Sequence, residues 1–407
     1  MKADIIVFTN HYPYGTSEGF LYEELQCLSA SFYHILLCPL DSANKSFQRT
    51  VPENVKIFSP PFPDYKSKIL LLSHGIFKPT PYKILIHDFI RSKVWTSRKK
   101  ILRWFVASLF IRTYLPVLKR ILSTIENPDN VLLYFYWGLQ WSQLVPCMPL
   151  LKNKIAIRFH GSDLYEFLYK GYIPLRELQL KRANLLVTVS ETGKTYLTGR
   201  YPHLSLKIYL SRLGTIDYGW DPSGYQRTNT YLIVSCSNLV PVKRIHLIPR
   251  ILKFVNLNIH WVHFGNGPEI KDIKKICKLL PSNVSFEFKG FVPTSEIIRF
   301  YQEHSVDLFI NVSASEGVPV SIMEALSFGI PVIATDVGGT GELISNKNGL
   351  LIPKDFESEK VAGQIIILLT GADFQDKREN ARKTWETYSN ATVNYPEFAS
   401  LLFRLKQ

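Results

Sequence analysis

Two carboxylates, Glu316 and Glu324, lie eight residues apart in the chain, between two apolar runs that are typical of strands. Glu316 stands in a turn, and Pro319 and Gly329 are placed to begin and to end the short helix that carries Glu324. Carboxylates accept hydrogen bonds from hydroxyl groups, and a helix N-terminus offers N–H groups to an anion. The pattern therefore predicts a binding site for a ligand that carries both hydroxyl groups and phosphate.

Three more candidate residues follow other apolar runs. Lys243 stands at the start of a predicted helix, where an ammonium group and a helix N-terminus could together bind a diphosphate. Gly265 comes directly after a predicted strand, where a glycine lets the backbone turn sharply or approach a ligand closely. His160 also ends a predicted strand, and from the residues alone a structural role for it is more common than a catalytic one.

The elements that must position these side chains form two series of strands and helices. In the second series the strands are expected at 231–236, 259–264, 284–288, 306–313, 331–336 and 349–352, with helices near 243–255, 268–280, 294–304, 320–328 and 358–370. Such alternation predicts a parallel sheet with right-handed crossovers. Loops at the carboxyl ends of parallel strands line the ligand crevice, so Glu316 and Lys243 are expected at one edge of the sheet.

The first series is less regular and contains a long insertion. Its strands are expected at 4–9, 34–40, 131–137, 154–160 and 185–190. The fold class is therefore α/β, with two Rossmann-like, doubly wound parallel-sheet domains. The turn-rich stretch 217–230 marks the linker, which gives an N-terminal domain of residues 1–220, a C-terminal domain of residues 221–385 and a terminal helix in 386–407.

Composition limits the class of protein further. The chain has 407 residues, of which 46% are apolar and 20% charged, as expected of two well-buried globular domains. Its five cysteines are dispersed and show no C-x-x-C spacing, so neither a zinc site nor a disulfide framework is expected and a reducing cytoplasm fits best. The N-terminus is predicted to be a buried strand, not a signal peptide, and no apolar run approaches the ~18 residues of a membrane span.

The net charge of +14 is concentrated in one segment. Thirteen of the 48 Lys and Arg, but only one acid, Asp88, lie between Lys66 and Arg120, where they alternate with apolar and aromatic residues. This composition predicts a basic amphipathic helix that lies on an anionic membrane surface. A solvated helix that packs its apolar face on the domain core is the alternative. Nucleic acid is not expected as a partner, since no recognised binding module is present.

The run E-G-V-P-V-S-I-M-E-A-L-S-F-G-I-P-V-I-A-T-D-V-G-G, residues 316–339, closely resembles the signature of family-4 retaining glycosyltransferases of the GT-B fold. The resemblance implies two Rossmann-like domains that face a cleft, with the donor bound by the C-terminal domain, the acceptor by the N-terminal domain, and a C-terminal helix that crosses back. It implies retaining, metal-independent transfer of a sugar from a nucleotide diphosphate sugar to a glycan or polyprenyl-linked glycan in surface polysaccharide biosynthesis. No cofactor is expected, and the location would be the cytoplasmic face of the membrane.

The resemblance also implies roles for individual residues. Glu316 and His160 would act at the reaction centre, on the transferred sugar. Lys243 would bind the diphosphate with an arginine five residues earlier, but this chain has Asn238 there, so either Arg244 or Arg212 compensates or the diphosphate is bound less tightly. The other implied donor-binding residues are Glu324 at the ribose, Phe291 near the base, and Gly15, Gly265, Gly317 and Val318.

Two other functions remain open from the sequence. A hydrolysing sugar-nucleotide epimerase can share the two-domain fold and a nucleotide diphosphate cleft. A non-catalytic, membrane-docked partner with a decayed donor site is the second alternative, and Asn238 is the residue that favours it. The sugar, nucleotide, acceptor and linkage depend on a few pocket contacts that these motifs do not encode.

Overall fold

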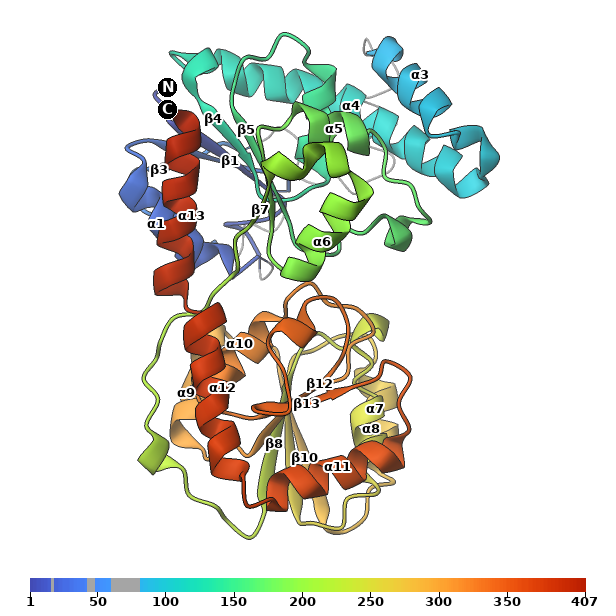
Figure 1. Ribbon diagram of the computed structural model, residues 1–407, viewed down its shortest axis with the longest axis vertical. Helices are drawn as coiled ribbons and strands as arrows, with labels where there is room; N and C mark the ends of the chain where they lie inside the picture. Colours follow the sequence, from blue (N-terminus) through green and yellow to red (C-terminus); the bar gives the residue numbers. More distant parts are fainter. Residues whose placement is uncertain (16–17, 42–47, 60–80) are drawn as a thin grey trace. The chain divides into compact units, whose positions relative to one another are not determined.

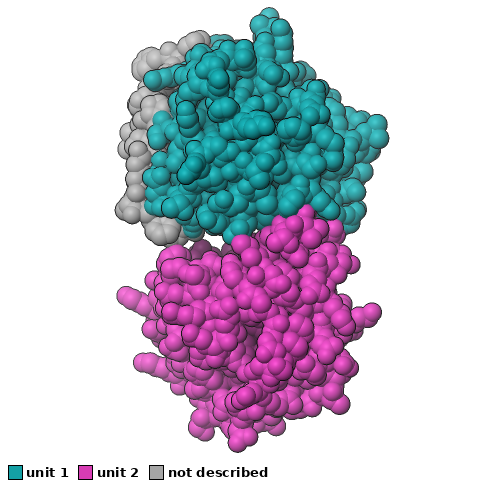
Figure 2. All heavy atoms as spheres, turned by 90° about the vertical axis from the view of Figure 1, so that its left-hand side faces the viewer, with its two compact units in different colours: residues 1–211, 395–407 teal, residues 212–394 magenta. Residues whose placement is uncertain are grey.

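The computed structural model describes residues 1–15, 18–41, 48–59 and 81–407. Two compact units divide the chain (Figure 2). Unit 1 comprises Met1–Ser211 and Tyr395–Gln407, and unit 2 comprises Arg212–Asn394. Both are parallel α/β units, as the sequence predicts, and each is described by itself (Figure 1).

Unit 1 is built on a seven-stranded parallel sheet of order β3-β2-β1-β4-β5-β6-β7. The strands are β1 (Ile5–Thr9), β2 (Ile35–Pro39), β3 (Val55–Ile57), β4 (Leu132–Phe135), β5 (Ile155–Phe159), β6 (Leu185–Thr188) and β7 (Ile208–Leu210). Every residue of β1, β2, β4, β5 and β6 is buried, which explains their continuous apolar runs. The order reverses between β1 and β4, so this is the topological switch point of unit 1.

Helices cover both faces of this sheet. The α-helices are α1 (Leu21–Ser31), α3 (Tyr82–Arg91), α4 (Arg98–Ser123), α5 (Arg176–Arg182) and α6 (Glu191–Arg200). Short 3₁₀ helices are η1 (Val94–Thr96), η2 (Pro128–Asn130), η3 (Gln140–Cys147), η4 (Glu166–Tyr169) and η5 (Pro202–Lys207). The predicted basic insertion is therefore helical where the structure describes it, in α3 and α4, whereas Lys66, Lys68 and Lys78 lie outside the described residues.

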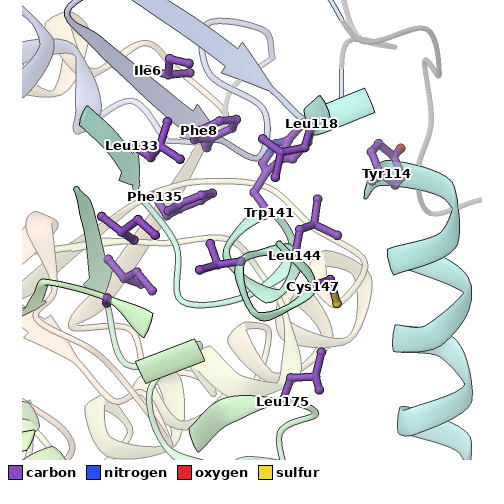
Figure 3. Packing of buried hydrophobic residues seen from close by; sticks show 14 of the residues in the cluster. Ile6, Phe8, Tyr114, Leu118, Leu133, Phe135, Trp141, Leu144, Cys147 and Leu175 are labelled. Atoms are coloured by element: carbon purple, nitrogen blue, oxygen red, sulfur yellow. The ribbon is translucent and has the colours of Figure 1, made fainter. Parts of the chain in front are cut away.

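The C-terminal half of α4 belongs to the core of unit 1. Tyr114 and Leu118 pack with Trp141 of η3, and Phe8 stacks on Phe135 with ring centroids 4.6 Å apart (Figure 3). Among the described residues α4 is the one helix long and apolar enough to cross a membrane, so the expectation that no segment has such a length is wrong. More than half of that apolar window (56%) is buried inside the protein, because the sheet needs an apolar cover.

The last helix, α13 (Ala391–Lys406), contributes residues 395–407 to unit 1. Phe398 is buried there and lies over the guanidinium of Arg158, 4.5 Å from ring centroid to carbon. Arg158 is itself fully buried and pairs with Glu24, which also accepts a hydrogen bond from Tyr134 at 2.6 Å. The C-terminal helix thus covers a buried ion pair and closes one face of the sheet.

The boundaries of unit 2 differ from the predicted ones at both of its ends. Unit 2 begins at Arg212 instead of residue 221, because Asp217 pairs with Arg382 at 2.5 Å and Trp220 packs against Gly329. It extends to Asn394 instead of residue 385. Residues 212–220 and 386–394 are held together by backbone hydrogen bonds between Thr215 and the segment 389–391.

Unit 2 has a six-stranded parallel sheet of order β10-β9-β8-β11-β12-β13. The strands are β8 (Tyr231–Cys236), β9 (Ile259–Phe264), β10 (Val284–Gly290), β11 (Leu308–Asn311), β12 (Val332–Thr335) and β13 (Gly349–Ile352), and all six predicted strands are confirmed. The helices are α7 (Leu247–Leu252), α8 (Ile270–Cys277), α9 (Thr294–Glu303), α10 (Val320–Ser327), α11 (Ser358–Thr370) and α12 (Phe374–Tyr388), with η6 (Pro222–Gly224), η7 (Pro241–Lys243) and η8 (Thr340–Glu342). Helices α7, α8 and α11 cover one face and α9, α10 and α12 the other (Figure 1).

One predicted helix is interrupted. The segment 243–255 contains η7 and, after a break, α7, because Arg244 adopts a left-handed conformation with φ of 50°. A residue in that conformation ends a helical turn. Lys243 therefore lies in a 3₁₀ turn before α7 and not in the first turn of an α-helix.

Candidate functional site

Lys243 and Glu316 come together at the edge of the unit 2 sheet. The sheet order reverses between β8 and β11, Lys243 follows β8, and Glu316 follows β11. Lys243 Nζ donates to Glu316 Oε1 at 2.6 Å, and Asn311 Nδ2 donates to the same oxygen at 3.3 Å. The pair therefore lies at the topological switch point, where open α/β sheets bind ligands.

Backbone contacts hold the loops that carry this pair. Ala314 N donates to Val242 O at 2.7 Å, which ties the Glu316 loop to the Lys243 turn. Gly339 N donates to Gly317 O at 2.7 Å, and a side chain at Gly338 would place its Cβ 2.0 Å from Glu316 O. Gly338, which follows β12, is thus needed for close approach to the Glu316 loop.

Glu324 lies inside α10 and is 9% exposed. Burial raises its pKa to about 7, because the ionised carboxylate loses hydration. Glu324 in turn helps to raise the pKa values of Cys236 and Tyr301, behind the effect of their own burial. A carboxylate in this setting gains most from a ligand that donates hydrogen bonds to it, as ribose hydroxyl groups would.

A hydrogen-bonded chain supports the glycine turn after β9. Trp261 Nε1 donates to Ser235 Oγ at 2.9 Å, and Ser235 Oγ lies 2.8 Å from His263 Nδ1. His263 Nε2 lies 3.1 Å from Ser237 O, which can only accept, so Nε2 carries the proton and Nδ1 accepts from the serine. Burial lowers the pKa of His263 to about 4, so the ring is neutral at pH 7.

Gly265 closes this turn tightly. Its φ is +133°, its N–H donates to Gly290 O at 2.8 Å, and a Cβ there would lie 1.9 Å from Ser237 O. Only glycine fits both the dihedral angle and the space. The turn therefore has a structural role, because it fixes the backbone just before Asn238.

The other predicted donor residues are dispersed around this edge. Asn238 is exposed, and Phe291 is 57% exposed after β10. The Arg244 guanidinium donates to the backbone oxygens of Val312 and Lys354, each at 2.8 Å. Arg212, the other cation that could replace an arginine at 238, lies 3.4 Å from Glu342. Gly317 and Val318 are half-buried beside Glu316.

In unit 1, His160 follows β5 within an aromatic enclosure. Its ring lies 4.6 Å from Tyr136, 4.5 Å from Trp137 and 6.0 Å from Phe20, measured between centroids. Burial, followed by the charge of Arg158, lowers the pKa of His160 well below its usual value. Both ring nitrogens are buried and have no partner among the described residues. The neutral ring thus keeps one donor and one acceptor for a ligand or water.

Asp163, three residues on, organises the loops around His160. Its carboxylate accepts from the backbone N–H of His160 at 2.7 Å and of Gly138 at 2.6 Å. It therefore joins the loops that follow β5 and β4. The end of β5 therefore holds both a candidate ligand-binding residue, His160, and the residue that supports its backbone, Asp163.

The loop after β1 holds a carboxylate of its own. Glu18 accepts from the backbone N–H of Asn10, His11 and Tyr12 at 3.1, 2.5 and 2.6 Å, and also from the indole of Trp137. This concave set of N–H groups is a typical anion site, and the protein's own side chain fills it. Gly15, predicted to approach the donor, has a φ of +69°, and its oxygen accepts from Arg49 at 2.6 Å.

Two residues of these sites are not found by sequence reasoning. Asn311 orients Glu316, and Trp137 joins Glu18 to the His160 enclosure. Asn311 gives a weak signal, because a polar side chain ends an otherwise apolar strand. Within the described part of the chain, no three His, Cys, Asp or Glu side chains gather as a metal site would require.

Unit 2 thus carries a cation and a carboxylate at the switch point of a doubly wound sheet. Residues 221–385 match the family model described as glycosyl transferases group 1. The match and unit 2 cover nearly the same residues.

The chain is also similar in sequence to several curated proteins and in fold to several solved structures. The chain is 27% identical, over 63% of its length, to a protein of Escherichia coli K12 named as the colanic acid biosynthesis glycosyltransferase WcaL, and the match covers 65% of that protein. It is 34% identical over 28% of its length to the amylovoran biosynthesis glycosyltransferase AmsK of Erwinia amylovora, of which 30% is covered. The matches thus span less than two thirds of these relatives. The Anabaena protein HepE, solved in complex with UDP, has a similar fold, with a TM-score of 0.62, 16% identity and 99% of both chains covered.

Proposed function

We propose that this protein is a retaining, metal-independent glycosyltransferase. It would transfer a sugar from a nucleotide diphosphate sugar to a glycan or polyprenyl-linked glycan during surface polysaccharide biosynthesis. The observation that carries the proposal is the pair Lys243 and Glu316 at the switch point of unit 2. The names of the relatives, which refer to colanic acid and amylovoran biosynthesis, support the pathway class.

Lys243 and Glu316 suit the two charges that develop during transfer. When the bond between the anomeric carbon and the diphosphate breaks, both electrons leave with the diphosphate oxygen, and an ammonium group beside that oxygen stabilises the departing anion. The anomeric carbon becomes electron-poor, and the carboxylate of Glu316 would orient the sugar hydroxyls around it. The acceptor hydroxyl oxygen then forms the new bond, and its proton passes to the departing diphosphate oxygen.

Two further residues would complete the donor and sugar contacts. Glu324 would accept hydrogen bonds from the ribose hydroxyls, which its burial favours. The His160 imidazole, neutral and with both nitrogens unpartnered among the described residues, would bind the transferred sugar. A buried polar group without a partner is costly, so a bound sugar hydroxyl is a reasonable explanation for this ring.

The proposed location is the cytoplasmic face of the membrane, with the basic insertion as the contact. Helix α4 begins with an exposed mixture of cations and apolar side chains, of which Leu102 is 63% and Phe105 47% exposed. Arg98 and Lys99 are exposed beside them. A surface that carries both cations and apolar side chains is more complementary to an anionic lipid layer than to water alone. Sedimentation with phosphatidylglycerol vesicles, compared with phosphatidylcholine vesicles, tests this part.

The test of the activity is product analysis with a panel of nucleotide diphosphate sugars and a glycan acceptor. We expect a glycoside with the anomeric configuration of the donor, formed equally in the presence and absence of a chelator. Free nucleotide and an inverted sugar without acceptor would instead identify a hydrolysing epimerase. Loss of activity with the chelator, or an inverted glycoside, would contradict the proposed mechanism.

A further inference from the structure

A cavity of about 450 Å³ lies in unit 1, between the basic insertion and the loop before α5. Helix α3, the turn at Lys93 and the start of α4 line one side. Tyr172, the start of α5 and the end of α6 line the other side. None of the residues predicted to bind the donor or the transferred sugar takes part in it.

The acidic side chains of this cavity already have partners. Glu177 pairs with Arg91 at 2.6 Å, and Glu166 pairs with Arg200 at 3.2 Å. Asp88 is buried and accepts hydrogen bonds from Tyr172 at 2.5 Å and from Ser92 at 3.2 Å. The lining holds five Lys or Arg side chains against three carboxylates, so an excess of positive charge remains.

Besides Arg176, whose guanidinium donates to the backbone oxygens of Gly138 and Asp163, two lysines are the remaining cations of the lining. Lys100 Nζ lies 3.3 Å from Ser92 O and 5.8 Å from the Tyr172 ring, and Lys93 is exposed at the mouth. Within the described residues, neither lysine pairs with a carboxylate. Lys93 also has a φ of +46°, an unusual conformation for a residue other than glycine. Flexible ammonium groups of this kind bind phosphate as point charges.

The outer face of α3 continues from the mouth of the cavity as two parallel stripes. Tyr82, Ile86 and Ile90 form an apolar stripe and are 59%, 52% and 59% exposed. Lys83, His87 and Arg91, each one residue further on, form a basic stripe, of which His87 and Arg91 also line the cavity. Residues four apart share one side of a helix, so the basic stripe lies between the apolar stripe and the cavity.

We infer that this cavity binds the phosphate or diphosphate group of an amphiphile whose hydrocarbon chain lies along the apolar stripe of α3. The inference deepens the proposed function. It rests on that function in one respect, because a polyprenyl-linked acceptor carries both a phosphate or diphosphate group and a hydrocarbon chain. The exposed apolar stripe is what selects a lipid-borne group over a free anion. Lys93 and Lys100 are binding residues in this account and have no part in sugar transfer itself.

The test is calorimetric binding of farnesyl diphosphate, inorganic pyrophosphate and farnesol to the full-length Lys243→Ala variant, in which the donor site binds diphosphates more weakly. We expect farnesyl diphosphate to bind at least about tenfold more tightly than pyrophosphate, and farnesol not to bind. Adding Lys93→Ala and Lys100→Ala should weaken farnesyl diphosphate binding about tenfold or more. Adding Lys152→Ala, an exposed lysine of unit 1 remote from the cavity lining, should change it by less than about twofold.

Three results would overturn the inference. They are no binding of farnesyl diphosphate, equal affinity for farnesyl diphosphate and pyrophosphate, or equal effects of the double and the control substitutions. These results do not depend on catalysis, since nucleotide sugar binding to unit 2 of the wild-type chain is a separate measurement. An inactive protein that binds the lipid would contradict the proposed function alone.

Discussion

Lys243 Nζ lies 2.6 Å from Glu316 Oε1, and the two residues follow β8 and β11, the strands on either side of the switch point in unit 2. The side chains are 25% and 9% exposed, so the ion pair is partly shielded from water. In the absence of a donor each group neutralises the other. A diphosphate must therefore compete with Glu316 for Lys243, and the two residues can be separated by experiment.

Glu316→Gln should separate donor binding from transfer. The variant removes the carboxylate that competes for Lys243, so nucleoside diphosphate affinity should stay the same or increase by a few-fold, about 0.5–1 kcal/mol. Transfer should fall by about 10²-fold or more, because the charge beside the anomeric carbon is lost. Calorimetry and initial rates measure the two effects. A parallel loss of binding and transfer would assign Glu316 to donor affinity alone.

Glu324 should make binding of a nucleotide diphosphate sugar depend on pH. Burial raises the pKa of this carboxyl to about 7, and ribose hydroxyls that donate to it favour the ionised form. Binding should therefore release a proton, and affinity should rise about tenfold between pH 6 and pH 8. The diphosphate of a nucleotide sugar does not titrate in this range. In Glu324→Gln the profile should be flat, and an equally steep profile in that variant would exclude Glu324 as its source.

His263 should reduce the stability of unit 2 in acid. Its folded pKa of about 4 is below the ordinary value of 6.5, so the unfolded chain takes up the proton first as pH falls. The contribution of the neutral His263 ring to the unfolding free energy is fully present above pH 6.5 and is lost progressively between pH 6.5 and 4. The loss between pH 7 and pH 5 amounts to about 2 kcal/mol.

The control for this prediction is necessary because Glu324 titrates in the opposite sense. Its raised pKa disfavours the folded state increasingly from about pH 4.5 to 7, so the two effects partly cancel in the wild type. Denaturant unfolding at pH 7 and pH 5 should therefore be compared between the wild type and His263→Gln. Removing His263 should reduce the acid-induced loss of unfolding free energy, and an unchanged difference would show that the ring titrates normally.

Glu24 should be essential for the stability of unit 1. It pairs with Arg158, and neither side chain is exposed to solvent. Glu24→Ala leaves the Arg158 guanidinium buried without its counter-ion, which should cost about 3–5 kcal/mol of unfolding free energy. Combining it with Arg158→Met should restore part of the loss, since no charge is then buried. A double variant less stable than the single one would show that the ion pair is not the cause.

Much of unit 2 could be predicted because its strands are covered on both faces. Such strands are continuous apolar runs, and parallel strands bring their carboxyl ends to one edge. The proximity of Lys243 and Glu316 follows from that rule, although their ion pair does not. The three-residue strands β3 and β7 could not be predicted, because so short a segment has no distinct pattern.

Other features depend on contacts between residues distant in sequence. Arg244 could be predicted as a spare cation for the diphosphate, but its guanidinium binds backbone oxygens of Val312 and Lys354. Glu18 gives no sign in the sequence that its carboxylate fills a set of N–H groups formed by residues 10–12. The cavity beside Lys93 joins segments that are about 80 residues apart, such as Asp88 and Tyr172. Only the folded chain brings these groups together.

The central claim, that Lys243 binds the donor diphosphate, is tested most directly by calorimetric titration with UDP, GDP and ADP. Lys243→Ala should weaken the binding of whichever nucleotide the wild type binds by about tenfold or more, since a charge-assisted contact contributes about 1.5–3 kcal/mol. Lys253→Ala removes an exposed lysine of the same unit and should leave the affinity unchanged. Equal affinities of the wild type and Lys243→Ala for that nucleotide would contradict the account.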